Sequence, residues 1–186
     1  MAARCEGVAV CSGLLKRDIS TLGIYYHADT DRVVIPVVDE HGVLVYWQAR
    51  AYDWTRRSTR PKYLNPKQVS AHMGVWFEGE GPRVLTEDYL SAYRVSKAGF
   101  ATATLMGTKL SEKVLARLLA EDRPVLVWLD NDQGRYMSNP GQEAAAKIVA
   151  KLRAVGLRVG NVVGDRDPKR YSRKEIINLL KGVSTR

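Results

Sequence analysis

The sequence predicts an α/β protein: a parallel sheet with helices on both faces, preceded by a small basic α+β subdomain. From residue 83 onward, short apolar segments alternate with helical patterns, which is the order that produces parallel sheets. Residues 32–52 instead hold two strand-like segments joined by a short turn. The segment EGEGP at 78–82 is a chain breaker between the two patterns. We therefore predict a basic subdomain in residues 1–80, the parallel-sheet domain in 81–170 and a short helix in 171–186.

The first subdomain is expected to contain an antiparallel hairpin. Residues 32–38 and 43–52 are rich in Val, Ile, Tyr and Trp, and a turn at 39–42 that ends in Gly42 separates them. Pro36 has no amide hydrogen for a sheet ladder, so it indicates an edge strand or a bulge in the first segment.

In the second domain, strands and helices are expected in strict alternation. The predicted strands are 83–86, 100–105, 125–129 and 157–163. Local signals fix the helices: Pro140 suits a first-turn position, Gly99 and Gly156 are stop signals, and Ser172 with Glu175 makes a capping box. The predicted helices are 87–97, 111–121, 140–155 and 173–180.

The charge of the chain indicates a polyanionic partner. Twenty-nine Lys and Arg residues against 20 Asp and Glu give a net charge of +9, which fits nucleic acid but also a basic soluble protein. Within 50–67 a cluster of cations is opposed only by Asp53, and Tyr52, Trp54 and Tyr63 are interleaved with it. Cations with aromatic rings bind the phosphates and stack the bases of a single strand. The cations are Arg50, Arg56, Arg57, Arg60, Lys62 and Lys67.

Other bulk features exclude several classes. The chain is 45% hydrophobic and 26% charged, as in soluble globular proteins. It has no apolar run of the roughly 18–20 residues that a membrane span needs, and no signal peptide pattern. Two cysteines and three scattered histidines form neither a disulfide framework nor a zinc pattern. We expect a cytoplasmic protein without a membrane partner.

Acidic residues follow three of the four predicted parallel strands. Glu87 follows the first, Asp130 and Asp132 follow the third, and Asp165 and Asp167 follow the fourth. Any one of them alone is more typical of a helix cap or a solvated turn. Residues at i and i+2 of an extended chain point to the same side, and the carboxyl ends of parallel strands meet at one edge of a sheet. Crowded carboxylates repel one another unless a cation lies between them, so this pattern predicts a Mg²⁺ or Mn²⁺ site.

This ordered set of acids resembles the TOPRIM domain, which bacterial-type primases share with type IA and type II topoisomerases and some nucleases. Residues upstream of these acids and further downstream narrow the resemblance to the catalytic core of bacterial replicative primases and the primase half of phage primase–helicases. These are RVVIP at 32–36, then Asp39, Gly42 and Arg50, PKYLN at 61–65, Gly107-Thr108 and Asp167-Pro168. The resemblance covers residues 32–180 and places the TOPRIM domain in 81–170.

The resemblance implies synthesis of short RNA primers from ribonucleoside triphosphates on a single-stranded DNA template. Asp130, Asp132 and either Asp165 or Asp167 would hold Mg²⁺ (or Mn²⁺), with Glu87 as a further metal ligand or a proton acceptor. The nucleotide or the template would contact a second set of side chains. In this set, Arg56, Arg57 and Arg60 either make general backbone contacts or belong to a solvated loop. The other members of that set are Arg50, Lys62, Tyr63 and Asn65.

The chain departs from the family pattern in several places. The glutamate is usually followed by glycine, but here by Asp88, which we interpret as a first-turn acid of a helix. The zinc-binding module is absent, and Gly107-Thr108-Lys109 lacks the spacing of a phosphate loop. We therefore expect a primase core in a bacterial or phage-infected cell, with a zinc-binding module and a replicative helicase in trans. The alternatives are a TOPRIM nuclease that uses the same metals and a non-catalytic nucleic-acid-binding replication accessory protein.

Overall fold

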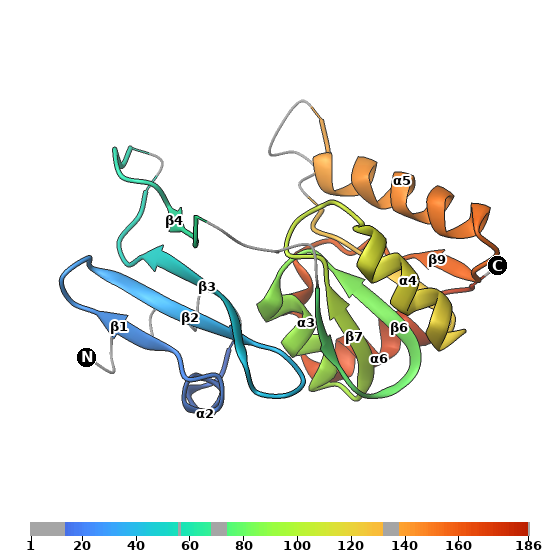
Figure 1. The fold of residues 1–186 in the computed structure, drawn as a ribbon, viewed down its shortest axis with the longest axis horizontal. Helices are drawn as coiled ribbons and strands as arrows, with labels where there is room; N and C mark the ends of the chain where they lie inside the picture. The colour runs from blue at the N-terminus through green and yellow to red at the C-terminus, as the bar shows by residue number, and fades with distance from the viewer. Residues whose placement is uncertain (1–13, 56, 68–73, 132–137, 186) are drawn as a thin grey trace. The chain divides into compact units, whose positions relative to one another are not determined.

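The computed structural model describes residues 14–55, 57–67, 74–131 and 138–185 (Figure 1). The chain forms two compact units, residues 1–69 and residues 70–186. In the described ranges, no helix has both the length and the apolar character that crossing a bilayer requires.

The first unit is built on a four-stranded antiparallel sheet in the order β1-β2-β3-β4. Its strands are β1 (Tyr25–His27), β2 (Arg32–Val38), β3 (Leu44–Ala51) and β4 (Tyr63–Leu64), and the short helix α2 (Lys16–Thr21) precedes them. The predicted hairpin is therefore confirmed as β2 and β3. Strand β2 is not an edge strand, because it lies between β1 and β3. Pro36 is nevertheless tolerated, because the pairing of β1 with β2 ends at Val34, and the expected irregularity occurs as a register shift at Val37/Val38.

The second unit contains a five-stranded sheet in the order β5-β7-β6-β8-β9. Four strands are parallel, which confirms the predicted alternation: β6 (Glu80–Thr86), β7 (Phe100–Thr104), β8 (Val125–Trp128) and β9 (Val159–Asn161). The addition is β5 (Val75–Phe77), an edge strand that pairs antiparallel with β7. The segment at 78–82, the predicted domain boundary, connects β5 to β6 and extends into β6 within this unit, and the two units divide between residues 69 and 70.

Helices cover both faces of this sheet, as predicted (Figure 1). Helices α4 (Glu112–Glu121) and α5 (Pro140–Ala154) pack on one face and α3 (Tyr89–Ser96) and α6 (Arg173–Lys181) on the other, with the 3₁₀ turn η2 (Pro168–Arg170) before α6. Strand β8 alternates between the two cores: Val125 and Val127 lie in one, Leu126 and Trp128 in the other. A strand covered on both faces reads as a continuous apolar run, which is why VLVWL stood out in the sequence.

The charged side chain of Arg83 lies inside this apolar framework. Arg83 on β6 is 1% exposed, and its guanidinium donates two 2.9 Å hydrogen bonds to the carboxylate of Glu121 on α4. It also donates to the carbonyl oxygens of Phe77 and Thr102 and lies 5.0 Å from the centroid of the Trp76 ring. Arg83 therefore ties the edge strand β5 to β7 and to α4.

Replacing Arg83 should destabilise the second unit strongly. In Arg83→Leu, the carboxylate of Glu121 and two carbonyl groups lose their donor, and breaking a buried pair from one side costs about 3–5 kcal/mol. Denaturant unfolding measures the change. Arg158→Leu, at an exposed position, is the control and should change the free energy of unfolding by less than about 0.5 kcal/mol. Equal effects of the two replacements would contradict the role of Arg83.

Candidate active site

The carboxyl ends of three neighbouring strands carry the acids that the sequence singled out. Strand β6 runs into Glu87 and Asp88, and β8 runs into Asp130. The loop after β9 contains Asp165 and Asp167. Because β6, β8 and β9 are adjacent in the sheet and parallel, these segments start from the same edge.

A lysine that the sequence analysis did not predict lies among these acids. The Lys169 Nζ atom is 2.9 Å from Asp88 Oδ2, 3.5 Å from Asp167 Oδ2 and 4.0 Å from Asp130 Oδ2. All four side chains are at most 24% exposed. Burial alone would lower the pKa of Lys169, but the three carboxylates raise it above its ordinary value, so the ammonium stays charged at neutral pH. The sequence feature that could have indicated this lysine is its position two residues after Asp167.

Asp88 serves the fold and the site together. It is the N-cap of α3, one position before the first turn in which we expected it, and its Oδ1 accepts hydrogen bonds from the amides of Leu90 and Ser91. Its Oδ2 accepts from Ser91 Oγ and Lys169 Nζ. Burial would raise the pKa of Asp88, but the charge of Lys169 and these hydrogen bonds lower it below the ordinary value.

Asp130 has the opposite electrostatic balance. Burial raises its pKa from 3.8 to about 7; Lys169 opposes the shift, while Asp88, Asp167 and Glu87 add to it. Among the described residues, neither Asp130 Oδ1 nor Asp167 Oδ1 has a hydrogen-bond partner, although both atoms are buried. A buried, unpaired carboxylate oxygen is costly in a folded protein unless a cation or a proton meets it.

The two acids of the loop after β9 occupy different places. Asp167 is 10% exposed at its side chain and lies beside Lys169. Asp165 is 77% exposed at its side chain and accepts a hydrogen bond from the Tyr171 hydroxyl. The sequence left open which of the two belongs with Asp130; the structure brings Asp167 to it and turns Asp165 toward Tyr171.

Asn131, the residue between the two predicted metal ligands, ties three loops together. Its Nδ2 donates to Gly164 O at 2.7 Å, and its Oδ1 accepts from Asn139 Nδ2 at 2.7 Å. Asn139 is also the N-cap of α5. The segment after β8 is thus fastened both to the loop after β9 and to the start of α5.

The first turn of α5 packs directly against the backbone of Asp130. A Cβ atom at Gly141 would lie 2.1 Å from the carbonyl oxygen of Asp130, so a side chain at this position would displace one of the two backbones. Gln142 Nε2 donates to the carbonyl oxygens of Leu129 and Asp130. The position of Asp130 therefore depends on the absence of a side chain at residue 141.

The donor set fits a hard divalent cation. Carboxylate oxygens suit Mg²⁺ and Mn²⁺, and Asp130 and Asp167 each have an unpaired buried oxygen. Glu87 is half-buried, and its charge contributes to the raised pKa of Asp130. Asp132 lies outside the described residues. Within the part of the chain that is described, no three acidic, His or Cys side chains form a ready-made metal cluster.

In the first unit, the predicted binding residues lie on and beside β3 and β4. Arg50 pairs with Tyr63 on β4 and with Val33 on β2, so all three side chains share one face of the sheet. The Lys62 ammonium lies 5.3 Å from the centroid of the Trp54 ring and 5.4 Å from that of Tyr63.

The remaining predicted binding residues of this segment differ in their surroundings. Asn65 and Arg57 are exposed, and Arg56 lies outside the described residues. Arg60 forms ion pairs with Asp31, at 2.9 Å, and with Asp53, which together raise its pKa above the ordinary value. The charge of Arg60 is therefore balanced by two carboxylates of the first unit, Asp53 in the same loop and Asp31 in the turn before β2.

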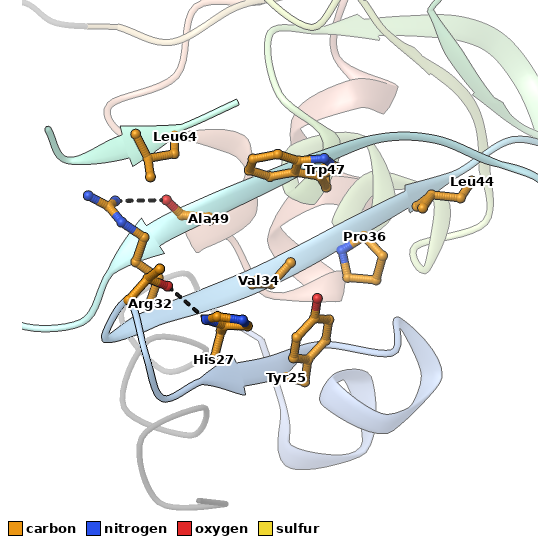
Figure 2. A pocket seen from close by; sticks show the side chains of 10 residues that line it. Tyr25, His27, Arg32, Val34, Pro36, Leu44, Trp47, Ala49 and Leu64 are labelled. Carbon is orange, nitrogen blue, oxygen red and sulfur yellow. Dashed lines mark hydrogen bonds between the residues drawn. The ribbon is translucent and has the colours of Figure 1, made fainter. Parts of the chain in front are cut away.

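The opposite face of the same sheet holds an apolar pocket of about 340 Å³ (Figure 2). Val34, Pro36, Trp47 and Leu64 line it together with Tyr25 and His27. Three of its polar side chains have partners: Arg32 donates to Ala49 O and Pro61 O, and His27 Nδ1 lies 3.0 Å from Thr30 Oγ1. Because Val34 and Leu64 alternate with Val33 and Tyr63 along their strands, the pocket and the Arg50 side chain lie on different faces.

Comparisons with known proteins give a relationship in structure alone. No family sequence model matches the chain, and no curated protein is similar to it in sequence. The fold matches that of the DnaG catalytic core with a TM-score of 0.70, at 16% identity, over 98% of this chain and 73% of that one.

Two further solved structures agree with this match. The E. coli primase catalytic core matches with a TM-score of 0.65 at 17% identity, over 97% of this chain and 72% of that one. The primase fragment of the bacteriophage T7 primase-helicase protein matches with a TM-score of 0.60 at 16% identity, over 92% and 72%. The chain spans 59% of a Pseudomonas aeruginosa DNA primase domain and 48% of an Aquifex aeolicus primase.

The second unit thus defines the class of the protein as an α/β fold, with a parallel sheet whose adjacent strands run into acids at their carboxyl ends. More specifically, the chain has the fold of the DnaG-type primase catalytic core, with a TOPRIM-type second unit. The fold that the sequence predicted is confirmed.

The raised pKa of Asp130 predicts a stability effect that depends on pH. A carboxyl whose pKa is about 7 when folded and 3.8 when unfolded stabilises the fold at low pH, and this contribution is lost as pH rises through 7. Asp130→Asn keeps the neutral shape at every pH. Without divalent metal, its melting temperature relative to wild type should rise from pH 5 to pH 8. If the difference in melting temperature between the two proteins did not change with pH, ionisation of Asp130 would not destabilise the fold.

Proposed function

We propose that this chain is the catalytic core of a DNA primase, which joins ribonucleotides into short RNA primers on single-stranded DNA. The observation that carries the proposal is the pair of buried, unpaired oxygens on Asp130 and Asp167, at the carboxyl edge of a sheet with the fold of primase cores. The cofactor would be Mg²⁺ or Mn²⁺, and the substrates ribonucleoside triphosphates.

We call the acids at the carboxyl ends of β6, β8 and β9 the acidic edge, and each of these residues has a role that follows from its chemistry. Asp130 and Asp167, with Asp132, would hold the metal, and Glu87 would act as a further ligand or accept the proton from the primer 3′-hydroxyl. A bound Mg²⁺ supplies positive charge to the phosphates and lowers the pKa of the hydroxyl. The 3′ oxygen then attacks the α-phosphorus, and pyrophosphate leaves. Asn131 orients the edge through its hydrogen bonds to Gly164 and Asn139.

The first unit would bind the nucleotide and the template strand. Arg50 and Tyr63 share one face, and the ring of Tyr63, at 39% exposure, is available for stacking a base. Lys62 and Asn65 would contact phosphates, and Arg57 and Arg56 would make general backbone contacts. For Arg60, the pairs with Asp31 and Asp53 support a positioning role in which it shapes the loop before Lys62.

Partners follow from what the similar structures contain. One is a DnaG catalytic domain bound to single-stranded DNA, another comprises zinc-binding and RNA polymerase domains, and a third comes from a primase-helicase protein. We therefore propose single-stranded DNA as the template, and a zinc-binding module and a replicative helicase as partners in a bacterial or phage-infected cell.

A second candidate is a non-catalytic nucleic-acid-binding protein of the replication machinery. One observation favours it: the Lys169 ammonium already supplies positive charge to Asp88, Asp130 and Asp167. In that case the acidic edge would be a structural remnant, and DNA binding would not depend on metal.

Primer synthesis tests the proposal directly. With labelled ribonucleotides, single-stranded DNA and Mg²⁺ or Mn²⁺, short RNA products are expected from the wild-type chain. Asp130→Asn and Asp167→Asn should each lose about 100-fold or more, because a metal ligand contributes several kcal/mol to transition-state stabilisation.

Asp165→Asn is the matched control in this assay. It lies two residues from Asp167 but is exposed and bonded to Tyr171, so it should retain synthesis. Cleavage of the DNA in place of synthesis would indicate a nuclease. If no products form with the zinc-binding module and the helicase added, the non-catalytic candidate stands.

Salt dependence separates phosphate contacts from stacking in the first unit. If the five cations of residues 50–67 other than Arg60 contact phosphates, the log–log slope of single-stranded DNA affinity against salt should be about −3.5. Lys62→Gln should make the slope shallower by about 0.7, whereas Tyr63→Ala should lower affinity by about 5- to 100-fold and leave the slope unchanged. Lys174→Gln, at an exposed position of α6, is the control. A wild-type slope near zero would remove the nucleic-acid role of residues 50–67.

A further inference from the structure

The lysine inside the acidic edge is the feature that the proposed function leaves unused. We propose that Lys169 is a resident cation, which occupies the place of a second divalent ion, so that the edge binds one divalent cation and not two. The inference rests on the proposed function in one respect, that the edge is a divalent metal site at all.

The carboxylate oxygens divide into two sets around Lys169. The Oδ2 atoms of Asp88, Asp167 and Asp130 all lie within 4.0 Å of the ammonium. The Oδ1 atoms of Asp130 and Asp167 are buried, and no described residue forms a hydrogen bond with them. One oxygen of each of these two ligands therefore faces a fixed charge, and the other remains to be satisfied. Asp167 is 8% exposed as a whole residue, so water does not readily meet this need.

Asp88 is an anchor for the lysine and not a metal ligand. Both of its oxygens are in use: Oδ1 caps α3 through Leu90 and Ser91, and Oδ2 accepts from Ser91 Oγ and Lys169 Nζ. A metal ion could reach Asp88 only by breaking the helix cap or displacing Lys169. The acid that follows Glu87 and the lysine that follows Pro168 thus form one 2.9 Å pair, built from two distant segments of the chain.

The backbone holds Lys169 in this position. Lys169 is the middle residue of η2, and Pro168 at its start fixes the backbone angle φ. Tyr171, the residue that follows η2, accepts a 2.9 Å hydrogen bond at its carbonyl oxygen from Arg94 Nε of α3. The ammonium is therefore placed by a rigid turn and retained by three carboxylates.

Two-metal phosphoryl-transfer sites place their ions about 3.5–4 Å apart between shared carboxylates. An ammonium within 3.5 Å of Asp167 and 4.0 Å of Asp130 fills that space and repels a second dication. One ion on the Oδ1 side, together with the ammonium, gives the edge its positive charge. Lys169 is thus a positioning residue with a permanent charge, and the edge is a mixed site of one metal ion and one lysine.

Counting bound ions tests this proposal without any activity. Mn²⁺ binding to the full chain, measured by titration calorimetry and by the electron paramagnetic resonance signal of free Mn²⁺, should give one ion per chain. Lys169→Met removes the charge and keeps the length of the side chain; it should bind two ions, the first about tenfold more tightly. Lys169→Arg should bind like wild type, and Lys174→Met is the control for loss of a lysine elsewhere.

A second variant guards against a folding defect in Lys169→Met. Asp88→Asn with Lys169→Met removes both members of the pair, and asparagine still caps α3. This double variant should also bind two ions, the first more tightly than the wild-type chain binds its one ion. Two ions on the wild-type chain, or the same count and affinity in wild type and both variants, would overturn the proposal.

The outcomes distinguish this inference from the proposed function. One Mn²⁺ on wild type and two on Lys169→Met, without primer synthesis by any form, would leave the resident cation in place and overturn the primase activity. No Mn²⁺ on wild type but binding to Lys169→Met would show that the lysine has replaced the metal entirely, and would remove metal-dependent catalysis from this chain.

Discussion

In a parallel sheet that helices cover on both faces, the side chains along the central strands are buried, so charged side chains are placed at the strand ends. In the second unit, every residue of β8 from Val125 to Trp128 is buried, and the first polar side chain comes at Asp130. The strands on either side of β8 also run into acids beyond their carboxyl ends, Glu87 and Asp88 after β6 and Asp165 and Asp167 after β9, so these acids start from the same edge. The apolar cores thus concentrate negative charge in one small volume, and everything else at the site responds to that concentration.

The crowded carboxylates of the edge are stabilised to different degrees, and this difference separates the acids by role. Asp88 is stabilised by a helix amide pair and a lysine, which lower its pKa, whereas Asp130 is left short of partners and its pKa rises to about 7. A group that is poorly satisfied in the empty protein gains more from a ligand than one that is already satisfied. The difference between two neighbouring carboxylates therefore separates a structural acid from a functional one, although both stand at strand ends.

Local patterns sufficed for the features that depend on local physics. The apolar run before Asp130, the hairpin around residues 39–42 and the capping box of α6 each follow from periodicity or a short motif, and the structure contains all three. The strand β5 escaped prediction because three residues at a sheet edge carry too little periodicity.

What required the structure depends on contacts between distant segments. Asp165 and Asp167 have the same side chain in the same short loop, so the sequence does not distinguish them. In the structure, Asp167 lies beside Lys169, whereas Asp165 accepts a hydrogen bond from Tyr171. The pair of Asp88 and Lys169 spans 81 positions, so no local signal marks it. The roles of the acidic edge and of the basic stretch stay predictions, and the geometry narrows which members of each set carry them.

The close approach of Gly141 to the Asp130 carbonyl has a consequence for how this protein can change over generations. Any single-base change in a glycine codon that alters the amino acid adds a side chain, and here even the smallest would meet backbone at 2.1 Å. Mutation can explore the exposed loops freely, but at this position every coding step leads into a collision beside the acidic edge. The acids and the lysine of the edge can therefore be replaced during evolution, whereas residue 141 at the start of α5 has to remain glycine.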